Sequence, residues 1–105
     1  MNIHPLTLEY LKKVALRPGM FMQAFDLHAL ELQLYGFEAG LSAAGVMGDF
    51  ESFNRSFPDF LRSTAELSCS QGWAMAILSK YGQSERTFGV FLSLLEKAAS
   101  ASSAS

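Results

Sequence analysis

Apolar residues repeat with helical spacing most clearly between residues 26 and 45, which predicts one long helix. They recur every three or four positions along one side, with three more beside them: Leu27, Leu30, Leu34, Phe37, Leu41 and Ala44, flanked by Leu32, Tyr35 and Ala39. We therefore expect a mostly buried central helix. Gly36 and Gly40 lower its intrinsic stability, and their spacing of four indicates that another helix packs closely against them.

Two further helices are predicted, one on either side of this stretch. Residues 6–17 form an amphipathic pattern that ends at Pro18, because proline disfavours helical geometry in the preceding residue. Residues 49–69 favour a helix in two pieces. Asp49 would cap the first piece, and Pro58 would lie in the first turn of the second, where a missing N–H group costs nothing.

The last two helices complete an all-α domain. Residues 71–81 stop at Gly82, and Ser84 caps a helix that runs toward the C-terminus. The alternating β-branched runs that are typical of strands do not occur. We predict a single-domain bundle of about five helices around the central helix, covering residues 1–99. A serine- and alanine-rich tail, residues 100–105, is expected to be disordered.

The composition is typical of a small folded domain. The 105 residues are 50% hydrophobic and 17% charged, which excludes global disorder. The single cysteine, Cys69, excludes an internal disulfide and a cysteine-based metal cluster, and it favours a reducing, cytoplasmic location. Residues 1–16 carry charges inside their apolar pattern, and no apolar run reaches the roughly 20 residues that span a bilayer. We therefore expect a soluble protein without a secretion signal and without membrane insertion.

Few side chains offer catalytic or metal-binding chemistry. Cys69 is the only soft nucleophile, and neither His4 nor His28 lies in a recognisable cysteine-hydrolase context. The two histidines are not three or four residues apart, so they do not form a helical pair that could hold zinc. We expect no enzymatic activity, no catalytic residue, no metal ion and no cofactor. A small hydrolase that uses Cys69 is the alternative, and a Cys69→Ser substitution would test it.

The net charge of −2 is unevenly distributed along the chain. No lysine or arginine occurs between Arg17 and Arg55, but that segment contains five acidic residues: Asp26, Glu31, Glu38, Asp49 and Glu51. They form either a solvated face or a docking surface for a cationic partner protein. Glu31 and Glu38 are seven residues apart, so both project from the same side of the central helix. Direct nucleic-acid binding is not expected, because phosphates require the opposite charge.

Several stretches of the chain occur in an order that resembles one bacterial protein family. They are an Arg-Pro-Gly-Met-aromatic turn, an apolar helix ending in Gly-aromatic, and later core positions: Arg17-Pro18-Gly19-Met20-Phe21, then Leu27, Leu30, Leu34 and Tyr35-Gly36-Phe37, then Phe50, Phe57, Gly72-Trp73, Ile77, Glu85, Phe88, Phe91 and Leu94-Leu95. Over residues 6–98 the chain resembles the small all-helical immunity proteins encoded beside toxins in contact-dependent inhibition and other polymorphic toxin loci. Gln23 departs from the pattern, since relatives usually have glycine there.

The resemblance implies a non-enzymatic inhibitor that binds one cognate toxin and covers its active site. Many such toxins are nucleases with cationic clefts, which agrees with an acidic binding face. The matching positions are structural and transfer no contact residue, so the five acidic residues are expected to bind the partner on the charge argument alone. A monomer is favoured, and the interface is open between the central helix and residues 45–57. The alternative function is a helical interaction or self-assembly domain without a toxin partner.

Overall fold

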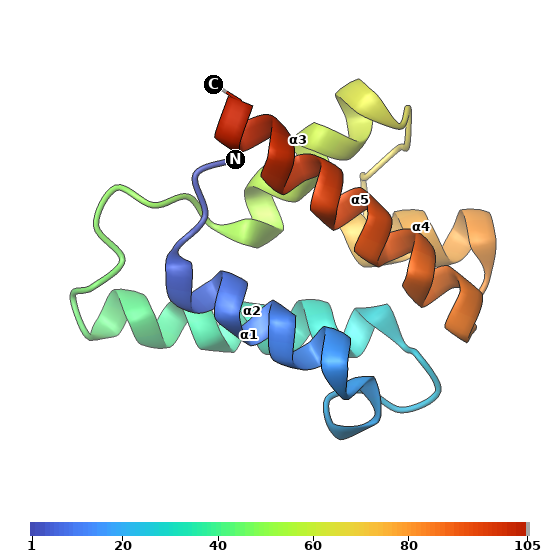
Figure 1. Ribbon diagram of the computed structural model, residues 1–105, viewed down its shortest axis with the longest axis horizontal. Helices are drawn as coiled ribbons and strands as arrows, with labels where there is room; N and C mark the ends of the chain where they lie inside the picture. Colours follow the sequence, from blue (N-terminus) through green and yellow to red (C-terminus); the bar gives the residue numbers. More distant parts are fainter. Residues whose placement is uncertain (105) are drawn as a thin grey trace.

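The computed structural model describes the backbone of residues 1–104 and the side chains as far as residue 100, and it is mostly helical (Figure 1). The elements are α1 Pro5–Leu16, the short 3₁₀ helix η1 Pro18–Met20, α2 Leu27–Ala43, α3 Phe53–Thr64, α4 Trp73–Tyr81 and α5 Glu85–Ala104. The predicted all-α, single-domain bundle of about five helices is confirmed. Extended pairing in this described part is limited to one isolated bridge, between Ile3 and Glu51.

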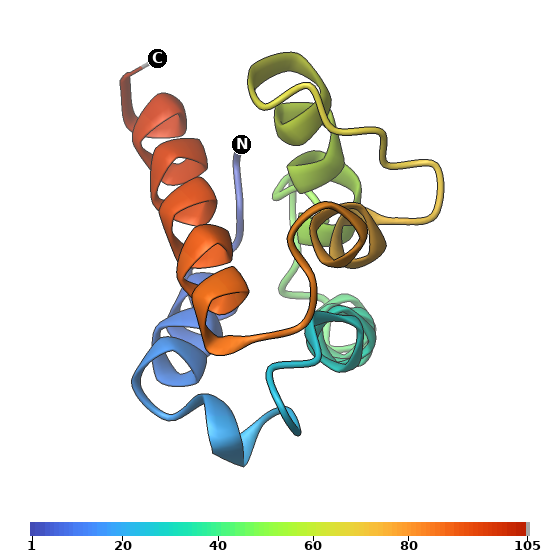
Figure 2. The ribbon, with the colours of Figure 1, turned by 90° about the vertical axis from the view of Figure 1, so that its right-hand side faces the viewer.

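The helices form two layers. α1 and α5 lie on one side of the molecule and α2, α3 and α4 on the other, an arrangement that Figure 2 shows from the side. The molecule measures 37 × 31 × 24 Å along its principal axes. Buried side chains from both layers fill the space between them and form one hydrophobic core.

Trp73, the first residue of α4, lies at the centre of this core. Its ring is fully buried and stacks on Phe91 of α5 at a centroid distance of 5.0 Å. Phe53 and Phe57 of α3 meet the same ring edge-on, at 5.7 and 5.6 Å. Aromatic pairs in these geometries stabilise a core beyond the area they bury. The indole Nε1 donates to Asn54 Oδ1 at 2.7 Å, so the polar atom of Trp73 is also satisfied.

α2 is buried along one side only, which corrects the expectation of a mostly buried central helix. Leu30 and Leu34 are fully buried, whereas Leu32 and Tyr35 are each 56% exposed and Ala39 is exposed as well. The reason is that α1, α3 and α4 all pack against the same half of α2. The apolar residues that widen the predicted stripe therefore face outward.

The two glycines of α2 lie on this outward half, so no helix in the described chain packs closely against them and that prediction is wrong. A Cβ atom added to Gly36 or Gly40 would meet no other atom within 4 Å. Neither glycine has the positive φ angle that other residues avoid. The fold of the monomer therefore does not require glycine at these two positions.

α3 is one continuous helix, contrary to the two pieces expected from Pro58. It begins at Phe53 rather than at residue 49, so Pro58 lies inside it. Proline removes one helical hydrogen bond and crowds the preceding turn, at a cost of about 3 kcal/mol. Phe53, Phe57 and Leu61 are fully buried along one side, and burial of such side chains contributes about 1.5–3 kcal/mol each. Packing therefore outweighs the local penalty.

The predicted end of α4 and the predicted N-terminal cap of α5 are correct. α4 ends before Gly82, whose φ angle of 86° is one that glycine adopts without strain. Ser84 caps α5, since its Oγ accepts a hydrogen bond from the N–H of Thr87 at 3.2 Å. Both signals depend on neighbouring residues only, which explains why they could be recognised without knowledge of the fold.

α5 extends beyond the predicted domain boundary. It continues to Ala104, so the tail that was expected to be disordered from Ser100 is helical to that residue, and Ser105 lies outside the described residues. None of the helices described, α5 included, combines the length and the apolar character that crossing a lipid bilayer requires.

Candidate functional site

Glu38 lies on the buried side of α2 and holds the start of α3. Its carboxylate accepts hydrogen bonds from Phe53 N at 2.9 Å, Ser52 Oγ at 3.2 Å and Thr7 Oγ1 at 3.1 Å. Phe53 is the first residue of α3, and the side chain of the N-cap residue Ser52 makes no capping bond. A carboxylate at this place satisfies an unpaired N–H group and faces the positive end of the helix dipole. Glu38 thus joins α1, α2 and α3.

Glu31 holds the start of α4 in a similar way. Its Oε2 lies 3.5 Å from the backbone N of Ala74, and its Oε1 lies 3.4 Å from Nδ1 of His28. The N-cap residue of α4 is Gly72, which has a φ angle of 94° and no side chain that could cap the helix. A Cβ atom on Gly72 would lie only 2.5 Å from Oε2 of Glu31. Glycine therefore allows the carboxylate of Glu31 to reach the N-terminus of α4.

The placement of these two glutamates corrects the expected partner-binding surface. Glu31 is 5% exposed and Glu38 is 7% exposed, so neither carboxylate is accessible to a partner. They do project from the same side of α2, as their spacing predicts, but that side faces the core. A signal for this was present in the sequence, because Glu38 follows Leu34 by four residues and precedes Leu41 by three, which places it within the apolar stripe.

The other three predicted acids do not form one face either. Asp26 caps the N-terminus of α2, where its Oδ1 accepts the N–H of His28 at 3.1 Å. Asp49 and Glu51 are exposed and follow the C-terminus of the same helix. The 17 residues of α2 separate its two ends by about 25 Å. The five carboxylates therefore do not make a single acidic docking surface.

Glu51 connects the N-terminal segment to the start of α3. Its Oε1 accepts the N–H of Asn2 at 2.8 Å, and its Oε2 accepts the hydroxyl of Ser56 at 3.0 Å. These hydrogen bonds, that of Asn2 first, favour the ionised carboxylate and hold the pKa of Glu51 below its ordinary value of 4.5. Glu51 is exposed, but both of its oxygens are already engaged within the chain.

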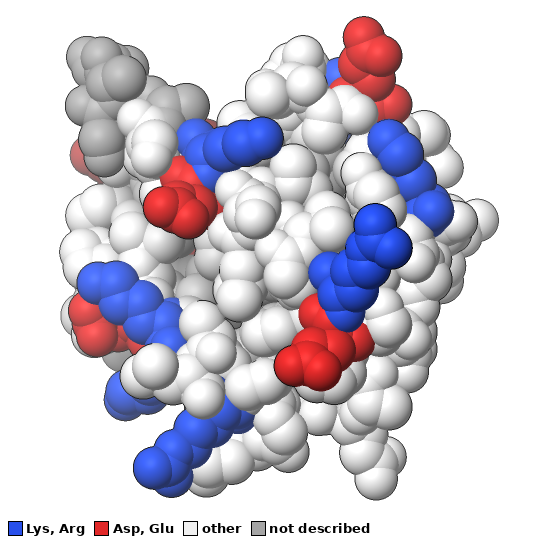
Figure 3. Space-filling model, turned by 45° about the vertical axis from the view of Figure 1, so that its right-hand side comes forward, with Lys and Arg blue, Asp and Glu red and all other residues white. Residues whose placement is uncertain are grey.

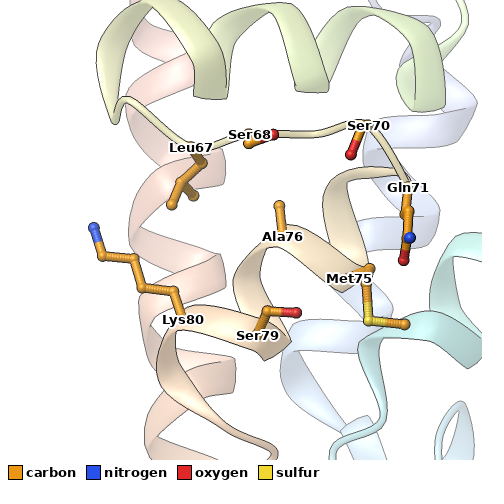
Figure 4. A pocket seen from close by; sticks show the side chains of 8 residues that line it. All are labelled: Leu67, Ser68, Ser70, Gln71, Met75, Ala76, Ser79 and Lys80. Carbon is orange, nitrogen blue, oxygen red and sulfur yellow. The ribbon is translucent and has the colours of Figure 1, made fainter.

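The outward face of α2, formed by Leu32, Tyr35, Gly36, Ala39 and Gly40, is exposed and apolar. It carries no lysine, arginine, aspartate or glutamate. Met75 of α4, itself exposed, points toward α2 beside the hollow shown in Figure 4. Tyrosine and leucine side chains surrounded by small residues are well suited to contact another protein. The apolar pattern of α2 predicts these residues to be buried, so it did not indicate this surface.

Charges are mixed in sign on the face of the molecule that Figure 3 shows. Positive and negative groups alternate there, with uncharged surface between them. Exposed pairs one helical turn apart occur in α1, between Lys12 and Glu9 at 3.4 Å, and in α3, between Arg62 and Asp59. Exposed pairs of this kind contribute little to stability. That face offers no broad field of one sign to attract a charged partner.

An open hollow of about 390 Å³ lies between residues 67–71 and α4 (Figure 4). Its lining includes hydroxyl, amide and ammonium groups and consists of Leu67, Ser68, Ser70, Gln71, Met75, Ala76, Ser79 and Lys80. None of these lining residues is a histidine or a carboxylate that could take a proton from a serine hydroxyl. The hollow therefore lacks the histidine and the carboxylate of a serine–histidine–carboxylate triad.

Cys69 is buried, and His4 has a structural role at the start of α1. Cys69 is 8% exposed, and burial raises the pKa of its thiol, which disfavours the reactive thiolate. His4 is the N-cap of α1: its Nδ1 accepts the N–H of Leu6 at 3.0 Å, which leaves Nε2 to donate to the carbonyl of Val46 at 3.0 Å. No group of three or more histidine, cysteine, aspartate or glutamate side chains in the described residues is placed to hold a metal ion.

Comparisons with known proteins add no relative. Models of protein families, curated proteins and solved structures all give no match to this chain. The resemblance to immunity proteins therefore depends on the residues quoted for it.

Proposed function

We propose that this chain is a protein-binding domain that acts by contact alone, and that it neutralises a bacterial toxin domain by binding it through the outward face of α2. The observation that supports the proposal most directly is the exposure of Leu32 and Tyr35 on a helix whose opposite side is buried. A contiguous exposed apolar surface of this kind marks a site of interaction in many folded proteins. The toxin as partner comes from the resemblance of residues 6–98.

The outward face of α2 has the properties of a protein-docking site. Tyr35 is the kind of residue that contributes strongly to interfaces, because its ring buries a large area at a small cost in side-chain entropy. Gly36 and Gly40 add no Cβ atoms, so a partner could approach the backbone of α2 closely. α2 is held by the contacts of Glu31 and Glu38 to two other helices. A pre-ordered surface reduces the entropy that binding has to overcome.

The charge of the toxin is not part of this proposal. The expectation of a nuclease with a cationic active site depended on five acidic residues that share one face. Two of them, Glu31 and Glu38, are buried at helix N-termini. The outward face of α2 is uncharged, so binding there would be governed by apolar contact and would change little with salt concentration.

Growth protection tests the function. The chain would be co-expressed with the C-terminal toxin domain encoded by the neighbouring reading frame, and growth and co-purification would be measured. We expect growth to be restored and a stable complex to be recovered. If the neighbouring frame encodes no inhibitory domain, or if growth arrest persists although the chain is folded and abundant, the proposed function is wrong.

A matched pair of glycine variants tests the surface. Gly36→Arg would place a long cation on the outward face of α2, whereas Gly89→Arg makes the same change at an exposed helical glycine of α5 that also has open space around it. We expect Gly36→Arg to weaken toxin binding at least about tenfold, because desolvating an unpaired charge in an interface is costly, and Gly89→Arg to bind normally. Equal binding by both variants would show that another surface makes the contact.

Self-association is the second candidate, because an uncharged apolar face can also bind a copy of itself. Light scattering of the chain alone separates the two functions. A monomeric mass that increases only when the toxin domain is added agrees with the proposal. A dimer that Gly36→Arg dissociates and Gly89→Arg leaves intact would instead favour a self-assembly domain.

A further inference from the structure

A second exposed apolar area lies where α1 ends and η1 begins. Leu16 is 81% exposed and Met20 is 72% exposed, the highest values among the large hydrophobic side chains of the described chain. Together with Lys13, Arg17 and Phe21 they line a cavity of about 230 Å³ whose walls are apolar. We call these five residues the basic–apolar patch. It belongs to elements other than the outward face of α2.

The basic–apolar patch is built on an ordered turn. Met20 N donates to the carbonyl of Arg17 at 3.1 Å, and Phe21 N donates to the carbonyl of Pro18 at 3.0 Å. The ring of Phe21 packs edge-on against Tyr10 at 5.3 Å, and the side chain of Gln33 donates to the carbonyl of Phe21. The exposed side chains therefore project from a fixed backbone, so little ordering is needed when a partner binds.

The charge of the patch is positive and is not neutralised within the chain. Lys13 and Arg17 form no ion pair with any described acidic residue, while Lys12 next to them pairs only with the exposed Glu9. Lys13 and Arg17 flank the apolar cavity that Leu16 and Met20 help to line. A ligand for this site would combine negative charge with an apolar group.

We infer that the basic–apolar patch binds an acidic segment of another protein, and that an apolar side chain of this segment enters the cavity between Leu16, Met20 and Phe21. The volume of about 230 Å³ is below the roughly 300 Å³ at which pockets for small-molecule ligands begin, but it accommodates one aliphatic or aromatic side chain. Complementary charges would orient the segment and raise its association rate. This inference does not depend on the proposed function.

An acidic protein segment fits the patch better than an anionic lipid surface does. Helices that lie on bilayers insert a long apolar face into the headgroup region. The apolar side of α1 instead faces the core, where Leu11 and Val14 are buried. Leu16, at the C-terminal end of α1, is exposed and adjoins a concave cavity, which suits a single inserted side chain.

A peptide titration tests the inference. The probe is a short glutamate-rich peptide with one central leucine, added to the intact, isotope-labelled chain at low salt. We expect the methyl signals of Leu16 and Met20 to shift, and the peptide with alanine in place of leucine to bind about tenfold more weakly, because less apolar surface is buried. If both peptides bind equally, no side chain enters the cavity and the inference fails.

Charge-reversal variants locate the binding. The double variant Lys13→Glu with Arg17→Glu should weaken peptide binding about tenfold at low salt, and increasing salt should narrow the difference. The matched control, Arg86→Glu with Lys97→Glu on α5, makes the same change of net charge at exposed positions outside the patch. Equal weakening by both double variants would show a non-specific effect of net charge and would overturn the assignment.

Two further measurements separate this inference from other outcomes. Vesicles that contain phosphatidylserine should not bind the chain through the patch. The inference would be overturned if the chain binds vesicles but not the peptide, and if the Lys13→Glu and Arg17→Glu double variant abolishes vesicle binding. That result would assign the patch to a lipid surface. Binding of the toxin domain through α2 should be unchanged in the patch variants. Failure of the peptide test therefore leaves the proposed function standing, and the reverse also holds.

Discussion

Glu38 is the residue whose role depends most on its surroundings. The same carboxylate that increases the negative charge of the sequence receives a backbone N–H and two hydroxyl groups from α1 and the start of α3. A polar carboxyl group is tolerated at 7% exposure because these donors replace the water it has lost. Charge in the sequence is therefore not equivalent to charge on the surface.

Glu38→Gln tests this role. The amide keeps the size of the side chain but loses the negative charge and brings an NH₂ group toward the N–H of Phe53. We expect the free energy of unfolding to fall by about 1–3 kcal/mol, since buried donors lose a charged acceptor. Urea unfolding measures the change. The matched variant Glu96→Gln alters an exposed glutamate of α5 and should stay within about 0.5 kcal/mol of the parent; an equal effect of both would contradict the capping role.

At the scale of single elements, α2 has two different sides. One side supplies leucines to the core and two carboxylates to the N-termini of α3 and α4. The other side is apolar and exposed, with glycines that no intramolecular contact requires. Helix glycines with open space and ordinary φ angles reduce stability without a structural reason inside the monomer. This supports an external role for the outward face of α2.

Two Gly→Ala substitutions should have opposite effects. Gly36→Ala lies in open space on α2 and should raise the free energy of unfolding by about 0.5–1 kcal/mol through higher helix propensity. Gly72 has a φ angle of 94°. Alanine at this position would place a Cβ atom against the carboxylate of Glu31, so Gly72→Ala should lower the free energy of unfolding by about 1–3 kcal/mol. Thermal and urea unfolding compare the two. Destabilisation by Gly36→Ala would show that the outward face has a packing role within the monomer.

At the scale of the whole molecule, hydrogen bonds join the N-terminal segment to a segment far away in the sequence. The N-terminal segment pairs with the end of the connection between α2 and α3, where Glu51 N donates to the carbonyl of Asn2 at 2.8 Å. Glu51 returns a side-chain bond to the N–H of Asn2 and accepts another from Ser56 in α3. These contacts hold the first residues of the chain against the start of α3.

The hydrogen bonds of the Glu51 carboxylate to Asn2 and Ser56 predict that stability falls in acid. The pKa of Glu51 in the folded chain is lowered from its ordinary value of 4.5, so the folded state binds the proton less readily than the unfolded state does. The contribution of Glu51 to the free energy of unfolding is therefore fully present above pH 4.5. It is lost as the pH falls through the lowered pKa that Glu51 has in the folded state. Glu51→Gln should remove this part of the pH dependence in urea unfolding between pH 7 and 3. Parallel pH profiles for the two proteins would contradict it.

The charged and glycine residues show where prediction from sequence was limited. The sequence correctly predicts that two glutamates and two glycines lie in the helix at residues 26–45, namely Glu31, Glu38, Gly36 and Gly40. The prediction is wrong about which of them face the core and which face solvent. Helical spacing gives relative directions around a helix and not absolute ones. Leu32 and Tyr35 were predicted to be buried because they are apolar. Glu31 and Glu38 were predicted to be exposed because they are charged.

The sequence by itself determined the all-α class and the approximate number of helices. It also determined that α1 ends before Pro18, that α4 ends before Gly82 and that Ser84 caps the start of α5. These features follow from backbone restrictions and from hydrogen bonds between near neighbours. Only the tertiary structure decided that α3 continues through Pro58, that two glutamates bind helix N-termini and that one side of α2 remains uncovered. These outcomes depend on which helices meet in space, since burial and donors from distant segments set the cost of a proline, a charge or an exposed leucine.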